Sequence, residues 1–364
     1  MRVFLIGLVC LACGVSFAGE APPIWEALKL PDAAAGKSLH AVCFTGDGKS
    51  GWIAGEGGLC VATTDGGATW AVQTTGSAAR LRDVRFNNPL QGWAVGEGDP
   101  AGPAPRGHVV MMPGMAMKSG TCLSTEDGGK TWTNHWVPTN FELCCVETAA
   151  APQIQIGNSG GARHLDGDNL RSANGGKQWK SERVFRAVFD VRRVEGERWT
   201  LVGSPVAVGF MPTPTSALYT NKGCRALFSS DGGNTWQPSQ GTEGLKGRGS
   251  LRALAVRAGQ PVLAVGDRGA VAISTDAGQS WTLTESGTQQ DLWGVAYAGT
   301  ERPIAVAVGA KGTVLASADL GKTWKPVDLG DPTDLLDVAE AGEHVVVTTA
   351  TGIALRAPAV KLLP

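Results

Sequence analysis

The sequence predicts an all-β, seven-bladed β-propeller, and three observations lead to this fold. A turn motif that ends in tryptophan occurs six times along the 364 residues. The distance between successive copies is typical of one four-stranded blade per repeat. The chain also contains 51 glycines and 12 tryptophans but only two tyrosines, which fits many tight turns and short strands.

The six copies share the pattern Ser/Thr-x-Asp/Asn-x-Gly-x-x-Trp and are called the repeat turns below. The Asp or Asn side chain can accept hydrogen bonds from the backbone N–H groups that follow it. The glycine tolerates the positive φ of a tight hairpin, and the tryptophan can pack between neighbouring sheets. We therefore expect structural roles for the pairs Asp65 and Trp70, Asp127 and Trp132, Asn174 and Trp179, Asp231 and Trp236, Asp276 and Trp281, and Asp319 and Trp324.

The spacing of the repeat turns gives the number of blades. Their Asp or Asn residues are separated by 62, 47, 57, 45 and 43 residues, so the two longest steps contain insertions at about residues 99–121 and 204–225. First strands are expected at 39–44, 81–86, 251–256 and 292–297. After the sixth turn, three strands at 335–338, 344–349 and 352–357 lack a repeat turn. Residues 24–28, with Trp25, supply the missing outer strand, so both ends of the chain close a seventh blade and protect its edge.

Residues 1–18 have the features of a secretory signal peptide. Arg2 precedes an apolar run over residues 3–15, and Ser16-Phe17-Ala18 offers small residues for cleavage. The run is too short for a permanent membrane span. We expect an exported, periplasmic or extracellular protein with a single domain over residues 19–364 and no integral membrane segment. Lipoprotein anchoring through Cys13 remains the alternative.

Charge and ligand spacing exclude several classes of function. The chain has 32 Lys and Arg against 33 Asp and Glu, so it lacks the basic excess of a general nucleic-acid binder. Its five histidines share no metal-ligand spacing, and no CxxC motif occurs after the signal peptide. We expect a monomer without metal or cofactor. Six cysteines follow the signal peptide; Cys43 and Cys60 lie in apolar strands and can be buried thiols or form disulfides.

The repeat turn resembles the Asp-box of the bacterial neuraminidase repeat, which sialidases, some glucanases and sortilin-type receptors share. The lead Gly51-Trp52-Ile53-Ala54-Gly55-Glu56-Gly57, followed closely by the first repeat turn and combined with Trp25, gives a narrower resemblance. It is similar to the photosystem II stability/assembly factor family and its relatives in non-photosynthetic bacteria, over residues 22–358. In photosynthetic members the propeller binds a membrane-protein precursor through an arginine-rich patch. The resemblance implies a non-enzymatic scaffold or assembly factor.

Seven basic residues are candidates for binding a partner protein. They stand at the starts of first strands or in the turns after second strands, positions that gather around the axis on one face of a propeller. Arginine can clamp a carboxylate with two hydrogen bonds, which suits an acidic peptide or a segment of a membrane protein. The candidates, which can also be ordinary surface residues, are Arg80, Arg82, Arg186, Arg248, Arg252, Arg268 and Lys311.

A glycan-active propeller, either a hydrolase or a lectin, is the alternative function. Glycoside hydrolysis needs two carboxylates facing one cleft. Glu56, Glu97, Asp99, Asp267 and Asp291 lie at strand ends or turns that can reach a shared face. Sialidase chemistry also needs a tyrosine nucleophile, and only Tyr219 and Tyr297 exist. Tyr297 ends an apolar strand and is expected in the core, so no catalytic residue is assigned.

Overall fold

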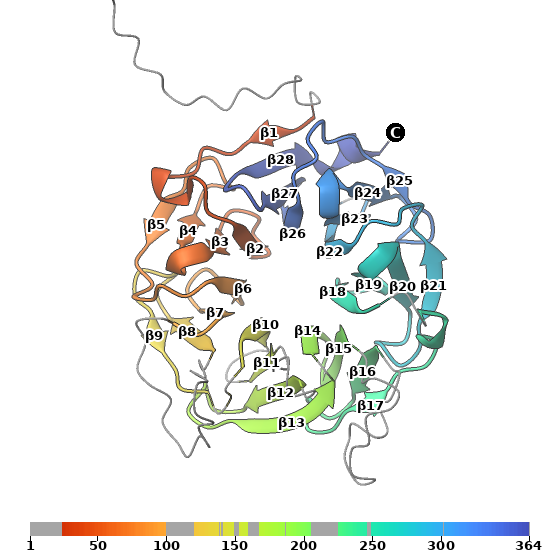
Figure 1. Ribbon diagram of the computed structural model, residues 1–364, viewed down its shortest axis with the longest axis horizontal. Coiled ribbons are helices and arrows are strands. Elements are labelled where there is room, and N and C mark those ends of the chain that lie inside the picture. The colour runs from red at the N-terminus through yellow and green to blue at the C-terminus, as the bar shows by residue number, and fades with distance from the viewer. Residues whose placement is uncertain are drawn as a thin grey trace, which may run out of the picture.

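Seven antiparallel, four-stranded sheets surround a central axis in the computed structural model of the chain (Figure 1). The structure describes residues 24–99, 120–137, 139, 141–148, 153–158, 167–185, 187–204, 225–245, 249–300 and 302–363. The ring confirms the predicted all-β, seven-bladed propeller. The signal peptide and most of both insertions lie outside the described residues.

Blades one to four follow one another along the chain, each with its first strand next to the axis (Figure 1). Blade one contains β2 (Leu39–Phe44), β3 (Gly51–Gly55), β4 (Cys60–Thr63) and β5 (Ala71–Gln73). Blade two contains β6 (Leu81–Phe86), β7 (Gly92–Gly96), β8 (Thr121–Thr125) and β9 (Thr133–Asn134). Blade three contains β10 (Leu143–Thr148), β11 (Ile154–Asn158), β12 (Gly167–Ser172) and β13 (Lys180–Phe185). Blade four contains β14 (Ala187–Glu195), β15 (Arg198–Ser204), β16 (Ala226–Ser229) and β17 (Gln237–Pro238).

Blades five to seven complete the ring. Blade five contains β18 (Leu251–Ala255), β19 (Val262–Gly266), β20 (Ala270–Ser274) and β21 (Thr282–Glu285). Blade six contains β22 (Leu292–Ala298), β23 (Ile304–Gly309), β24 (Val314–Ser317) and β25 (Lys325–Pro326). Blade seven contains β26 (Leu335–Ala341), β27 (His344–Thr349), β28 (Ala354–Pro358) and β1 (Glu26–Ala27). Short 3-10 turns lie at η1 (Asp32–Ala34), η2 (Glu56–Gly58), η3 (Glu243–Leu245), η4 (Asp267–Gly269), η5 (Ala310–Gly312) and η6 (Ala359–Leu362).

The N-terminal strand closes the seventh blade, as predicted. β1 pairs antiparallel with β28, with Glu26 opposite Arg356. The side chains of these two residues also form an ion pair at 2.8 Å. Trp25 is only 6% exposed and packs in the cluster that contains Val345 and Leu355. The first and last segments of the chain therefore share one sheet and one core.

The repeat turns form the hydrogen bonds that the motif predicts. In the first of them, the Thr63 hydroxyl donates to Asp65 Oδ1 at 2.7 Å and accepts the Gly67 N–H at 3.0 Å. Asp65 also accepts the backbone N–H and the hydroxyl of Thr69, at 2.9 and 2.6 Å. The equivalent bonds from the Ser or Thr hydroxyl and to the Asp or Asn side chain occur in the other five turns. These hydrogen bonds connect the two sides of each hairpin within a single turn.

The apolar core is divided into seven clusters of described residues, and each cluster lies between two neighbouring blades. Between blades one and two, the Trp52 ring stacks on Phe86 with 3.4 Å between ring centroids. Because each interface is apolar at its centre, the blades hold one another in place and fix the inner strands around the axis. Cys43, Cys60, Cys122 and Cys145 lie in these clusters as buried free thiols.

Candidate functional site: the axial cavity

The seven inner strands line a cavity of about 1010 Å³ along the axis of the ring. Every one of these strands, from β2 to β26, has a register shift after its first paired residues, a β-bulge at the same position in each blade. A bulge places two residues of one strand opposite a single residue of its neighbour and redirects a side chain. Here the redirected side chains belong to seven half-buried residues that line the cavity, the mouth ring: His40, Arg82, Cys144, Phe189, Arg252, Trp293 and Leu336.

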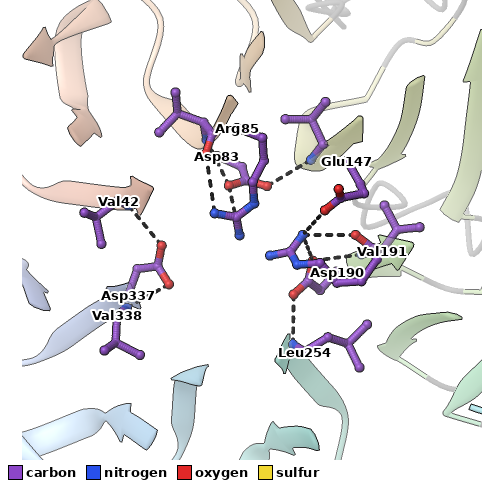
Figure 2. Close-up of polar contacts among 12 residues, drawn as sticks. Val42, Asp83, Arg85, Glu147, Asp190, Val191, Leu254, Asp337 and Val338 are labelled. Carbon is purple, nitrogen blue, oxygen red and sulfur yellow. Dashed lines mark hydrogen bonds and ion pairs between the residues drawn. The ribbon is translucent and has the colours of Figure 1, made fainter. Parts of the chain in front are cut away.

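One residue beyond the mouth ring, three aspartates connect neighbouring blades (Figure 2). Asp83 accepts its own blade's Val84 N–H at 2.9 Å and the next blade's Val146 N–H at 2.9 Å. Asp190 does the same with Val191 and Leu254, at 2.8 Å each, and Asp337 with Val338 and Val42, at 2.8 and 3.0 Å. Each carboxylate thus uses both oxygens, one for each of two blades. These residues are called the inter-blade aspartates below.

Charged residues deeper in the cavity surround the inter-blade aspartates. Arg192 Nη1 lies 2.6 Å from Asp190 and 3.5 Å from Glu147, and Arg85 Nη2 lies 3.6 Å from Asp83. In Figure 2 the Arg85 side chain extends into the middle of the ring, between Asp83 and Asp337. Among the residues that the structure describes, this cluster holds four carboxylates and two guanidinium groups.

Burial is the main cause of the raised pKa values of the carboxyl groups in this cluster. It raises the pKa of Glu147 to about 7 and the pKa values of Asp190 and Asp337 to about 6. The neighbouring guanidinium groups of Arg192 and Arg85 only partly oppose this rise, since each carboxylate also meets other carboxylates. A fraction of the Glu147 side chains is therefore protonated at neutral pH.

Of the predicted basic residues, Arg82 and Arg252 line the cavity, and both of them, like the neighbouring Arg80, are paired with acids. Arg80 contacts Glu56 at 3.1 Å and Glu97 at 3.0 Å, and Arg82 contacts the same Glu97 oxygen at 2.7 Å. Arg82 also reaches Glu142, and Arg252 pairs with Asp267. Side-chain exposure of 34–40% for these arginines leaves them accessible from the mouth. Positively and negatively charged side chains are therefore mixed around the mouth.

Two further basic candidates, Arg268 and Lys311, lie in short turns. Arg268 and Lys311 each occupy the middle of a 3-10 turn, η4 and η5, with φ of 54°. Their backbone N–H groups donate to Asp291 and Asp334, which hold the turns in place. Both residues are exposed. Arg186 and Arg248 lie outside the described residues, so their role stays a prediction.

The acids proposed for a glycan site have different partners from those a hydrolase needs. Glu56, Glu97 and Asp267 pair with the mouth arginines, and Asp99 accepts a hydrogen bond from Ser77 at 2.6 Å. The Tyr297 hydroxyl donates to the Pro261 carbonyl at 2.7 Å and its ring is buried, as expected of a core residue. Tyr219 lies outside the described residues.

Sequence reasoning missed the inter-blade aspartates and Glu147, which form the polar part of the cavity. A signal for the aspartates was present, because an apolar-x-Asp-Val pattern recurs at residues 81–84, 188–191 and 335–338. It stands in strands that are otherwise apolar, and the hydrogen-bond partner of each second oxygen comes from the next blade. Among the described residues, no group of three or more His, Cys, Asp or Glu side chains is arranged to hold a metal ion.

Comparison with known proteins supports the fold. No family model and no curated protein matches the chain. Among solved structures, it is similar to YCF48 bound to D1 peptide, with a TM-score of 0.63, 20% identity and coverage of 92% and 96% of the two chains. YCF48 from Cyanidioschyzon merolae gives a TM-score of 0.62 at 18% identity, covering 92% and 98%. The virginiamycin B lyase from Staphylococcus aureus gives 0.64 at 9% identity, covering 91% and 98%.

At 20% identity or less, these neighbours show that the chain shares their fold, and the fold by itself does not assign a function. Within the part of the chain that the structure describes, no helix has the length and apolar character needed to cross a bilayer.

Proposed function

We propose that this chain is an exported, non-enzymatic propeller that binds a segment of another protein at the mouth of the axial cavity. The observation that carries the proposal is the mouth ring. It combines accessible guanidinium groups, Arg82 and Arg252, with the apolar surfaces of Phe189, Trp293 and Leu336 around one opening. A peptide offers the matching combination of carboxylates and apolar side chains, and aromatic residues and arginine are enriched where proteins bind one another.

The pairing of the mouth arginines with acids is compatible with this function. Half-exposed ion pairs contribute little stability, on the order of 0–1 kcal/mol, because water screens them. A peptide carboxylate can therefore replace Glu97 or Asp267 as the partner of an arginine at small cost. The YCF48 neighbour, which was solved with a D1 peptide, provides a precedent for peptide binding on this fold.

The test is capture of partners from the native cell envelope by the tagged protein, followed by mass spectrometry. The double variant Arg82→Glu/Arg252→Glu should lose the captured protein while keeping the melting temperature of the wild type. Arg198→Glu is the matched control. Arg198 begins β15, is exposed and pairs with Glu195, away from the mouth ring. Equal capture by the wild type and the double variant would refute the proposal.

A glycan-active propeller is the second candidate, and Glu147 is the observation that favours it. Glu147 and Asp190 contact the same Arg192 nitrogen, and a carboxyl group with a pKa of about 7 suits a general acid. Against this, both Asp190 oxygens are bound by backbone amides, which leaves this group a poor nucleophile. Hydrolysis of aryl glycosides that is lost in Glu147→Gln would establish the enzyme and overturn the scaffold proposal.

A further inference from the structure

The inner strands present a ring of seven backbone N–H groups to the axis, one from the second residue after each bulge. Six of them are held by the inter-blade aspartates (Figure 2). Val42, Val146 and Leu254 donate to the aspartate of the preceding blade. Val84, Val191 and Val338 donate to the aspartate of their own blade.

The seventh N–H, that of Val295 on β22, has no such carboxylate. The preceding blade has Ala253 at the aspartate position, and Val295's own blade has Gly294 there. Val295 stands opposite Ala307, the register that Val84 and Ala94 occupy in blade two, so its N–H faces the axis in the same way. Among the described residues, this position in the ring is thus the one that lacks a side-chain acceptor.

The cavity is open at this position. Val295 and Ala253 both line it, and the neighbouring inner-strand residues Ala255 and Ala296 have small side chains. β6, which carries Arg85, lies across the ring from β18 and β22 (Figure 1). A group bound at Val295 would therefore have space on its own side and a guanidinium group facing it from the other side.

We propose that the Val295 N–H, beside Ala253, is a binding position for the carboxylate of a ligand that enters the axial cavity. The ligand carboxylate accepts the Val295 N–H as the inter-blade aspartates accept the other six, and Arg85 supplies the facing positive charge. The carboxylate can belong to an acidic side chain of a bound peptide or to a small organic acid. This inference goes beyond the proposed function, because the position lies inside the cavity and does not require the mouth arginines.

The charges around this position determine how binding depends on pH. Among the described residues, the groups that face it from β26 and from the inner strands β6, β10 and β14 are four carboxylates and two guanidinium groups, and an Arg257–Glu340 ion pair also lines the cavity. The neighbouring β18 carries one charged residue, Arg252, which belongs to the mouth ring. An added carboxylate raises the pKa of each acid beside it, so binding is coupled to the uptake of a proton. The acids that take it up are the three with raised pKa values: Glu147, Asp190 and Asp337. Affinity should therefore increase as the pH falls from 8 to 6.

The first experiment follows the backbone amide signals of the isotope-labelled protein by NMR during titration with acetate, with acetamide as the neutral comparison. The Val295 signal should move and saturate with acetate, more tightly at pH 6 than at pH 8, and should respond at least tenfold more weakly to acetamide. A Val295 signal that does not respond to acetate overturns the proposal.

The second experiment introduces a carboxylate of the protein itself beside the Val295 N–H. Ala253→Asp places a carboxylate where β6, β14 and β26 already have one, so it should weaken acetate binding at least tenfold. Ala41→Asp is the matched control: it adds the same charge to the same ring, next to a Val84 N–H that Asp83 already holds, and should leave the Val295 response in place. Equal acetate binding by Ala253→Asp and the wild type contradicts the proposal.

Two further arms identify the source of the carboxylate and separate this site from the mouth. A short peptide with one glutamate should shift Val295 if the natural ligand is a peptide, whereas a response to acetate and succinate alone assigns the site to small acids. Arg82→Glu/Arg252→Glu should keep the acetate response, because these residues belong to the mouth ring. A Val295 response that disappears in this variant would contradict an independent site within the cavity.

Discussion

The Val42 N–H of the first blade donates to the Asp337 carboxylate of the last blade across 3.0 Å, although 295 residues separate them. This bond closes the ring at the axis. At the outer edge, β1 pairs with β28 and Arg356 binds Glu26. The seam between the two ends of the chain is therefore held at both its inner and its outer side.

Removing the inner closure should destabilise the propeller. Asp337→Ala leaves the N–H groups of Val42 and Val338 without their acceptor. An unsatisfied buried donor costs about 1–3 kcal/mol, so we expect the free energy of unfolding to fall by about 3 kcal/mol. Asp328→Ala, at an exposed loop aspartate, should change it by less than about 0.5 kcal/mol. Urea denaturation of both variants measures the difference; equal loss in the two would show that Asp337 does not hold the seam.

Most of the architecture could be predicted from the sequence because its signals are local. Each repeat turn is a self-contained set of hydrogen bonds within seven residues, so Asp65 or Asp319 indicates a hairpin wherever it occurs. Trp25 could be recognised because it repeats that pattern's last residue. The function of Asp83 depends instead on Val146, in the next blade, and this relationship exists only once the ring has closed. The raised pKa of Glu147 likewise results from burial in a cavity that no single blade forms.

The repeat turns of blades five and six carry backbone strain that the sequence pattern did not indicate. Between the Asp and the Gly, four turns have a second glycine, whereas Ala277 and Leu320 stand there with φ of 60° and 63°. A left-handed conformation costs a residue other than glycine about 1–2 kcal/mol. Ala277→Gly should therefore raise the free energy of unfolding by about 0.5–1 kcal/mol, since glycine also loses more backbone entropy on folding.

The reverse change provides the matched comparison. Gly175 has φ of 68° at the same position of another turn, and a Cβ there would meet no atom within 4 Å. Gly175→Ala should lower the free energy of unfolding by a similar amount through conformation alone. Denaturation curves that show Ala277→Gly to be neutral or destabilising would contradict the strain argument.

Stability should decrease as the pH rises from 5 to 8. Burial raises the pKa of Glu147 to about 7 and those of Asp190 and Asp337 to about 6, so the folded state retains protons that the unfolded chain releases near pH 4. Their contribution is complete below pH 4 and is lost as the pH rises through 6 and 7. Glu147→Gln, which cannot ionise, should reduce this loss, whereas exposed Glu195→Gln should not. Melting temperatures across this range test the expectation; a higher melting temperature at pH 8 than at pH 5 would refute it.

The repeat-turn aspartates act in the opposite direction below pH 4. Hydrogen bonds from Thr69 and Thr131 lower the pKa values of Asp65 and Asp127 to about 2. Their contribution is present above the unfolded pKa and is lost as the pH falls toward 2. Together the two groups predict maximal stability between about pH 4 and 5. Asp65→Asn keeps a hydrogen-bond acceptor but has no ionisable group. The melting temperature of this variant should therefore fall less between pH 4 and pH 2 than that of the wild type.

Trp25 should matter as much to the seventh blade as the repeat tryptophans do to theirs. Its side chain is 6% exposed, comparable with Trp324 at 9%, and both belong to core clusters of neighbouring blades. Trp25→Ala and Trp324→Ala should each lower the free energy of unfolding by about 3–5 kcal/mol, the usual cost of truncating a buried tryptophan. Trp136→Ala, at a tryptophan that is 53% exposed, should cost less than about 1 kcal/mol. Because β1 pairs with β28, Trp25→Ala should also speed hydrogen exchange of the β28 amides, which Trp136→Ala should leave unchanged. If Trp25→Ala had the same denaturation midpoint as the wild type, the N-terminal strand would not be needed to close the ring.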